Sequence, residues 1–275
     1  MKRSMIQTVL LWCAAAALLL TAAGCEGGAQ TEGGPAKDES LQRILDAGQL
    51  VLGLDDSYPP MGFADENGEI VGFDIDVAQE VCDRLGIALV KQPIDWDTKE
   101  DDLNSGRIDC IWNGMSVTPE RAETMELSDP YMRNELIFVV PGGSDAKGVR
   151  DLKGKRTGVQ AGSTAEEALD ASELCADMTV MRFKDNIALL RELNKGTLDA
   201  VLLDSIVAYH VISVSEEQLF VLPDSLNEEE FAIGFRKGER ELCNKIQETI
   251  GGMKADGTLG EISRKWFGSD ITIVK

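Results

Sequence analysis

The chain has 275 residues, of which 27 are basic and 48 are acidic, and its formal net charge is −21. A surface this acidic argues against nucleic acid and anionic lipid as partners, because both carry charge of the same sign. The six cysteines and the single histidine form no C-x-x-C pair and no zinc motif, so we expect no metal and no cofactor.

The N-terminus has the three parts of an export signal. Residues 1–24 contain a basic tip, an apolar run over residues 9–20 and small residues that end just before Cys25. The apolar run is shorter than the roughly 20 residues that a membrane-spanning helix needs. Small residues before a cysteine resemble the bacterial lipoprotein signal, with Ala22 where that signal usually has leucine. The resemblance implies a signal peptide over 1–24 and lipid on Cys25; the alternative is an ordinary secretory signal with an incidental cysteine.

Residues 25–40 are rich in Gly, Pro, Ala and charge, which is typical of a flexible tether. No later segment reaches 18 consecutive apolar residues, so we expect the rest of the chain to be soluble. Signal cleavage would remove two of the 27 basic residues and none of the 48 acidic ones. We therefore expect an extracytoplasmic protein, lipid-anchored to the outer face of the cell membrane or on the periplasmic side.

Four cysteines lie beyond the tether, and the sequence leaves their pairing open. Cys82, Cys110, Cys175 and Cys243 could form disulfides, or they could be small buried residues. The single histidine, His210, lies on an expected helix, and we interpret it as a surface or packing residue rather than a general base.

Beyond the tether, strands alternate with helices, which is the pattern of an α/β protein. The expected strands, in chain order, are 49–54, 70–72, 88–92, 108–111, 135–140, 156–159, 180–183 and 200–203. The expected helices are 74–85, 98–105, 165–171, 186–195, 205–213 and one or two within 239–266. The helix over 74–85 has apolar residues at helical spacing and ends before a glycine.

A first candidate site segment is 115–121, which follows an expected strand and opens a helix. Thr118 fits the N-cap of that helix and is followed by proline at the first helical position. Arg121 then lies in the first turn, where its charge opposes the helix dipole. This placement suggests that the guanidinium binds another group, and a carboxylate is its natural match. The alternative is a surface arginine paired with Glu120 or Glu123.

Two further candidates follow expected strands. The glycine turn 162–164 leads into a helix, whose free backbone N–H groups can bind an anion. Ser163 and Glu166 have capping-box spacing, so a well-capped helix is the alternative. Asp204 ends an apolar strand at the carboxyl edge, where α/β sheets bind ligands. It could equally cap the following helix.

Seven segments together carry a family resemblance: 55–63, 72–76, 103–110, 114–121, 128–131, 158–164 and 255–260. From about residue 41 to 267 the chain resembles the bacterial extracellular solute-binding proteins of family 3, the substrate-binding lipoproteins of polar-amino-acid ABC importers. The resemblance implies an α/β, two-lobed periplasmic-binding-protein type II fold, in which each lobe has a central sheet flanked by helices. Two hinge strands would join lobe 1, formed by 41–133 plus 232–275, to lobe 2, formed by 134–231.

The resemblance also implies the ligand-binding residues. These are Asp55, Tyr58, Trp96, Asn113, Gly114, Met115, Ser116, Arg121, Ser163, Thr164 and Asp204. Arg121 would bind the α-carboxylate, with help from Ser116 and backbone N–H groups, and Asp204 would accept from the α-ammonium. An amino acid is a zwitterion, and each of its charges needs a hydrogen-bonded partner when it is buried.

Five positions concern the side chain of the ligand. Tyr58 and Trp96 resemble the aromatic pair that sandwiches it, and Asp55 lies where some relatives contact a polar or cationic end. Asn113 replaces the small residue common at its position, and Met61 replaces the usual phenylalanine. We expect a polar or cationic L-amino acid, without identifying which one.

The expected function is therefore that of the substrate-binding component of an ABC importer, with the permease subunits as partners and a monomeric state. A solute-binding-fold enzyme such as a periplasmic dehydratase is the alternative, but it would need a positioned acid or base in the cleft. A sensory ectodomain would need a membrane segment after the lobes. We expect no enzyme.

Overall fold

The computed structural model describes residues 37–215 and 218–275. The expected signal peptide 1–24, the lipid-attachment residue Cys25 and nearly all of the tether 25–40 lie outside the described residues. The tether was expected to reach residue 40, but Ser40 is already the first residue of helix α1. In the part of the chain that is described, no helix has the length and apolarity to cross a membrane.

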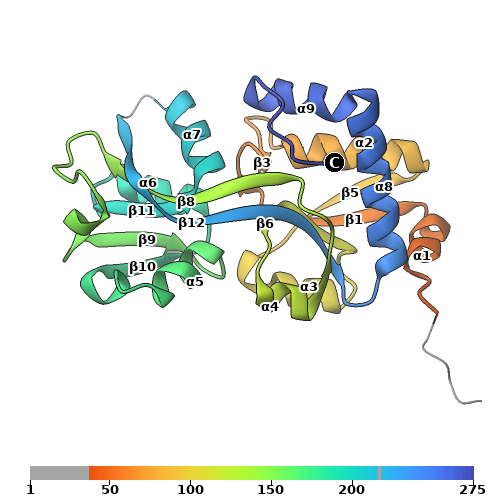
Figure 1. Ribbon diagram of the computed structural model, residues 1–275, viewed down its shortest axis with the longest axis horizontal. Coiled ribbons are helices and arrows are strands. Elements are labelled where there is room, and N and C mark those ends of the chain that lie inside the picture. Colours follow the sequence, from red (N-terminus) through yellow and green to blue (C-terminus); the bar gives the residue numbers. More distant parts are fainter. Residues whose placement is uncertain (1–36, 216–217) are drawn as a thin grey trace, which may run out of the picture. The chain divides into compact units, whose positions relative to one another are not determined.

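Strands and helices alternate along the described chain (Figure 1). The strands are β1 (Gln49–Leu54), β2 (Ser57–Tyr58), β3 (Gly62–Ala64), β4 (Ile70–Val71), β5 (Ala88–Pro93), β6 (Cys110–Ser116), β7 (Met125–Leu127), β8 (Met132–Pro141), β9 (Arg156–Gln160), β10 (Thr179–Phe183), β11 (Ala200–Asp204) and β12 (Leu219–Arg236). The α-helices are α1 (Ser40–Ala47), α2 (Phe73–Leu85), α3 (Lys99–Asn104), α4 (Pro119–Thr124), α5 (Thr164–Ala171), α6 (Asn186–Asn194), α7 (Ser205–Val214), α8 (Arg240–Asp256) and α9 (Thr258–Phe267). The 3₁₀-helices are η1 (Trp96–Thr98), η2 (Val149–Leu152) and η3 (Cys175–Asp177).

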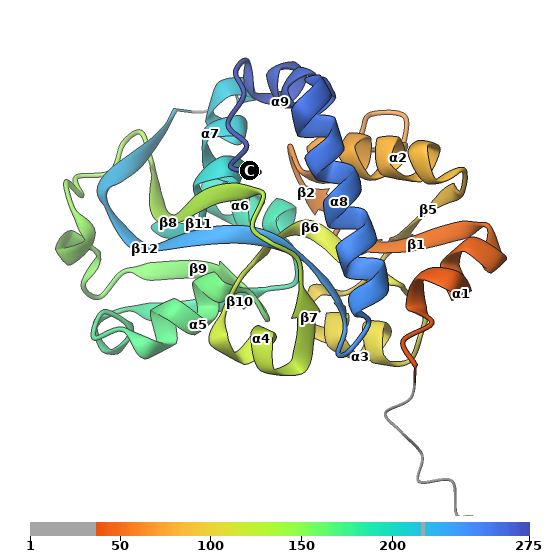
Figure 2. The same ribbon diagram turned by 45° about the vertical axis from the view of Figure 1, so that its right-hand side comes forward.

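One mixed sheet runs through both halves of the described chain, in the order β10-β9-β11-β8-β12-β6-β1-β5. Parallel strands form each end: β10, β9 and β11 at one, and β6, β1 and β5 at the other. Strands β8 and β12 pair antiparallel in the middle, and Figures 1 and 2 show them side by side, running from one half to the other. We call the half with β1, β5 and β6 lobe 1, and the half with β9, β10 and β11 lobe 2. The chain thus has the expected two-lobed α/β fold.

Most expected elements are present, with boundaries shifted by one to three residues. The strand expected over 108–111 was misplaced, because β6 begins at Cys110 and runs to Ser116. Strand β12 was not expected at all. Its pairing with β8 shifts register between Val221 and Ser225 and again before Asn227, so its exposed and buried residues do not alternate regularly. Bulges of this kind remove the period of two on which strand prediction depends.

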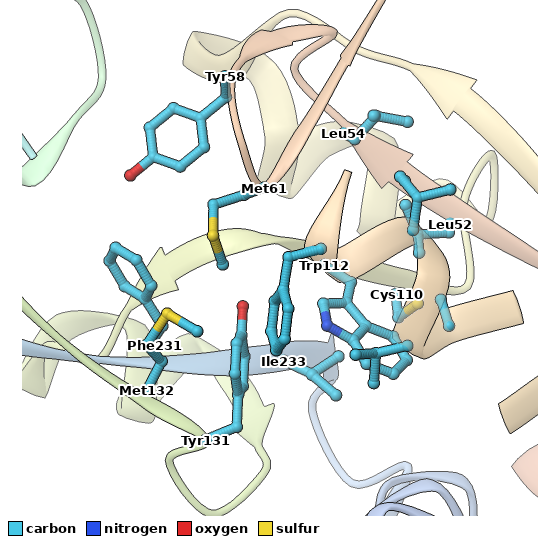
Figure 3. Packing of buried hydrophobic residues seen from close by; sticks show 14 of the residues in the cluster. Leu52, Leu54, Tyr58, Met61, Cys110, Trp112, Tyr131, Met132, Phe231 and Ile233 are labelled. Carbon is cyan, nitrogen blue, oxygen red and sulfur yellow. The ribbon is translucent and has the colours of Figure 1, made fainter. Parts of the chain in front are cut away.

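The core of lobe 1 supports the strand ends that face the cleft. Trp112 on β6 is almost completely buried, and Figure 3 shows it beside Ile233, in the same cluster as Tyr131. Helix α2 adds Phe73, whose ring stacks on that of Tyr131 with a centroid distance of 6.3 Å. The four cysteines beyond the tether are all free, so the open question of their pairing is answered: none of them forms a disulfide here.

Candidate functional site: the cleft between the lobes

A narrow cavity lies between the two lobes, at the ends of the strands. The lining residues come from both lobes and are Asp55, Tyr58, Trp96, Asn113, Gly114, Ser116, Arg121, Gln160, Ser163, Thr164 and Asp204. Of the residues expected from the sequence, Met115 alone is missing from this wall, and Gln160 lines it without having been expected. Segments far apart in the sequence therefore meet around one small, polar space.

Arg121 reaches the cavity from the short helix α4. The N-cap expected at Thr118 is present, because its hydroxyl accepts from the Arg121 backbone N–H at 3.1 Å. The guanidinium is buried, with 4% of the residue exposed, and its Nη1 donates to the Ser116 carbonyl at 2.8 Å. Its Nη2 has no acceptor among the described residues. Burial lowers the pKa of Arg121, but a guanidinium stays charged in proteins, so a buried cation presents a free donor here.

The turn before α5 brings backbone N–H groups to the opposite wall. Ser163 is the N-cap of α5: its Oγ accepts from the Glu166 N–H at 3.2 Å and donates to the Gln160 carbonyl at 2.7 Å. The capping box expected from the spacing forms only in part, because the Glu166 carboxylate accepts from the N–H of Gly162, at 2.8 Å, rather than that of Ser163. Thr164 follows and donates from Oγ1 to Ser116 of lobe 1 at 3.3 Å.

Asp204 ends β11 and faces the same cavity. It holds the N-cap position of α7 but makes no side-chain capping bond, so the capping alternative does not describe its carboxylate. One carboxylate oxygen instead accepts from Asn134 Nδ2 at 2.5 Å. Burial, followed by the nearby charge of Glu229, raises the pKa of Asp204 to about 7. A partly desolvated carboxyl of this kind gains from a cationic partner.

Asp55 and Gln160 meet across the cleft. Asp55 Oδ2 accepts from Gln160 Nε2 at 2.5 Å, while its Oδ1 accepts from the N–H and hydroxyl of Ser57. Burial raises the pKa of Asp55, and these hydrogen bonds act in the opposite direction. Gln160 is oriented by Asn186, which donates to its Oε1 at 2.9 Å. Gln160 directly follows the strand expected over 156–159, at the carboxyl edge where α/β sheets bind ligands, and this position was the sequence signal that could have identified it.

Asn113 supports Asp55 from β6. Its Oδ1 accepts from the Asp55 N–H at 3.1 Å. Its Nδ2 lies beside Gly62, where an added Cβ would stand only 2.6 Å away. Gly62, which has no side chain, therefore leaves room for the larger Asn113. The Asn113 amide in turn holds the backbone of Asp55 in place.

The two expected aromatic residues also line the cavity. Tyr58 lies against Gly114, where a Cβ would come within 2.7 Å of the tyrosine ring, and Gly114 has a positive φ of 59° that favours glycine. The Tyr58 hydroxyl is buried without a partner among the described residues, and burial together with the Asp204 carboxylate raises its pKa. Lys99 Nζ lies 5.3 Å from the centroid of the Trp96 ring.

Lys99 also connects the lobes. Its ammonium donates to the Gly162 carbonyl of lobe 2 at 3.1 Å, and only 6% of the residue is exposed. Burial and the nearby Arg121 lower the pKa of Lys99 to about 8. No pattern in the sequence indicated this contact.

Three singled-out residues lie away from the cavity. Met115 has no exposed surface and packs beside Gly234, where a Cβ would approach its Cε to 2.6 Å. Met61 is also fully buried, and Figure 3 shows its side chain within the core cluster. His210 is partly buried on α7, with its ring 6.1 Å from that of Phe63. In the described ranges there is no group of acidic, histidine and cysteine side chains that could hold a metal.

Comparison with known proteins identifies the family. The family model "Bacterial extracellular solute-binding proteins, family 3" matches residues 50–269, and the chain belongs to this family. The L-cystine-binding protein TcyJ of Escherichia coli (strain K12) is 31% identical over 239 residues, which is 86% of this chain and 89% of TcyJ. Such proteins bind solutes for transport, so the chain is a binding protein and not an enzyme.

Two solved structures are also similar. Tv2483 bound to L-arginine is 33% identical, with a TM-score of 0.83 and coverage of 86% of this chain and 98% of that one. An ABC uptake transporter substrate-binding protein from Streptococcus pneumoniae with bound histidine is 33% identical, with a TM-score of 0.82 and coverage of 87% and 100%. Both support the two-lobed fold described above.

Proposed function

We propose that this chain is the substrate-binding component of an ABC importer and closes its two lobes over one α-amino acid. The observation that carries the proposal is the pairing of unlike charges in one cavity: a buried guanidinium with a free donor, Arg121, and a partly buried carboxyl, Asp204. A zwitterion satisfies both groups at once, because its carboxylate matches Arg121 and its ammonium matches Asp204. Contacts to both lobes exist only in the closed state, so the ligand shifts the equilibrium toward closure.

The side chain of the ligand would extend toward Asp55, between Tyr58 and Trp96. Asp55 is an acceptor-only group when ionised, so it favours a ligand whose side chain ends in a donor or a cation. The similar proteins are named for, or contain, cystine, arginine and histidine, which all carry polar or charged ends. We therefore infer a polar or cationic amino acid.

The lobe boundaries complete this proposal. Lobe 1 would consist of 41–133 and 232–275 and lobe 2 of 134–231, with hinges where β8 and β12 leave lobe 1. Closure would then bend these two strands and carry 162–164 toward Arg121. The hydrogen bond that Lys99 of lobe 1 donates to the carbonyl of Gly162 in lobe 2 supports this direction of movement.

The anchor and partners follow from the same proposal. We infer that lipid on Cys25 holds the protein at the outer face of the membrane as a monomer, beside the permease subunits that receive the ligand. Membrane fractionation of Cys25→Ala tests the anchor, because the variant should leave the membrane fraction. Retention of the variant in that fraction would contradict it.

A thermal-shift screen of ligand-free protein against the common amino acids and L-cystine tests the binding function. A ligand at 1,000 times its Kd contributes about 4 kcal/mol, which corresponds to a shift of roughly 10 °C for a domain of this size. We expect shifts for amino acids with polar or cationic ends, and none for their D-enantiomers. Shifts with aliphatic amino acids only would refute the side-chain preference, and no shift with any of them would refute the function.

A further inference from the structure

Glu229 is a buried acidic residue directly behind the cleft, outside the set that lines the cavity. It lies on β12 and pairs in register with Asn134 on β8, so the two residues face each other on the strands that connect the lobes. Only 8% of Glu229 and 3% of Asn134 is exposed. A buried carboxylate needs hydrogen-bond donors, and the structure supplies two of them.

The first donor is Ser116. Its Oγ donates to Glu229 Oε2 at 2.6 Å, which is a short, charge-assisted distance. A serine hydroxyl has one proton and two lone pairs, so this bond uses the only proton that Ser116 has. Thr164 donates to the same Oγ at 3.3 Å and uses one lone pair. Ser116 can therefore offer the cavity an acceptor and not a donor.

The second donor is the amide of Asn134. Its Nδ2 bridges two carboxylates, with 3.1 Å to Glu229 Oε2 and 2.5 Å to Asp204 Oδ1. The orientation of this amide is set by Ser205, whose hydroxyl donates to Asn134 Oδ1 at 3.1 Å. The bridge holds the two acidic side chains next to each other, although like charges repel. This arrangement concentrates negative charge at one end of the cavity.

We propose that Glu229 is a positioning residue that makes Ser116 an acceptor and, through Asn134 and Asp204, makes this end of the cavity select an α-ammonium. The inference rests on the proposed function and deepens it. It also revises the expectation that the Ser116 hydroxyl helps to bind the ligand carboxylate, because that hydroxyl has no proton left to donate. Binding of the carboxylate then depends on Arg121 and backbone N–H groups.

Glu229→Gln tests this proposal, because it keeps the size of the side chain and removes the charge. The ligands are the tightest-binding amino acid of the screen and the same molecule without its α-amino group; for L-arginine the second ligand is 5-guanidinopentanoate. Calorimetry should show that the variant loses at least tenfold in affinity for the amino acid, while its affinity for the desamino compound is unchanged. The ratio of the two affinities, which measures the preference for the α-ammonium, should therefore fall at least tenfold.

Glu228→Gln is the matched control, since it removes the same charge from an exposed neighbour on β12 and should leave both affinities unchanged. If Glu229→Gln does not fold, Ser116→Ala replaces it and should narrow the same preference by removing the acceptor. Equal weakening of both ligands would show a merely structural role and overturn the inference, while amino-acid binding by the natural protein would still support the function. If the natural protein binds no amino acid, the proposed function fails first and this inference fails with it.

Discussion

Gln160 of lobe 2 donates a hydrogen bond from Nε2 to Oδ2 of Asp55 in lobe 1 at a distance of 2.5 Å. This bond joins the two walls of the cavity through the carboxylate that we expect to recognise the ligand's side chain. Asp55 thus has one oxygen held within its own lobe by Ser57 and the other oriented by the opposite lobe. A carboxylate fixed from both sides is preorganised for a donor, and preorganisation lowers the cost of binding.

Asp55→Asn should reduce the preference for cationic amino acids. The substitution keeps the shape of the side chain but removes its charge, so L-arginine should bind at least tenfold more weakly, about 1.4 kcal/mol, while neutral amino acids lose less. Calorimetry with L-arginine and L-glutamine measures the difference. The exposed neighbour Asp56 provides the control, because Asp56→Asn should change neither affinity. An unchanged ratio in Asp55→Asn would show that this carboxylate does not face the ligand's side chain.

Arg121→Ala should weaken amino-acid binding by at least tenfold, about 1.4 kcal/mol, without unfolding the protein. The physical reason is the loss of the buried cation that would neutralise the ligand carboxylate. Titration calorimetry gives the affinity, and circular dichroism checks the fold. Arg133→Ala removes the same charge from an exposed position on β8 and should have no effect. Unchanged affinity in Arg121→Ala would remove this residue from the site.

Amino-acid affinity should fall as the pH drops below about 7. Burial and Glu229 raise the pKa of Asp204 from 3.8 to about 7, so the ligand-free carboxyl takes up a proton in this range. An ammonium requires the ionised form, and each pH unit below the pKa should therefore weaken binding by up to about tenfold. The free energy of unfolding depends on pH in the opposite direction. Because the pKa of Asp204 is higher in the folded than in the unfolded protein, the contribution of Asp204 to the free energy of unfolding falls as the pH rises from 3.8 to about 7.

Calorimetry from pH 5 to pH 8 measures this dependence. In Asp204→Asn the affinity should be low at every pH, and its dependence on pH should disappear. A natural protein whose affinity stays constant over this interval would mean that Asp204 does not contact the ammonium.

Gly162→Ala should hinder closure of the lobes. A Cβ at this position would stand 2.9 Å from Asp97 Cα of the opposite lobe, and the backbone φ is +68°. We expect affinity to fall several-fold or more, and X-ray scattering should show a larger radius of gyration in saturating ligand. Gly154→Ala is the control, since it has a similar φ of +73° but no atom within 4 Å of the added Cβ. If both variants bind equally well, the approach of Gly162 to lobe 1 does not limit closure.

Much of the fold could be predicted, because its strands and helices follow local rules. Strands β1 and β11 are short apolar runs, and Gly86, the C-cap of α2, adopts the left-handed conformation expected of it. The strand β12 could not be predicted, because its acidic stretch and its register shifts obscure the period of two. Of the two strands that connect the lobes, the sequence therefore predicted only β8, as the strand over 135–140.

The sequence by itself determined the family, the alternation of elements and the residue types that gather in the cleft, because motifs and hydrophobic periods are properties of neighbouring residues. Only the tertiary structure decided which polar group meets which. Gln160 lies 105 positions from Asp55, and Glu229 lies 113 positions from Ser116, and no local pattern relates them. Their contacts arise because strand ends from distant segments converge on one desolvated cavity, where each buried polar group must find a partner.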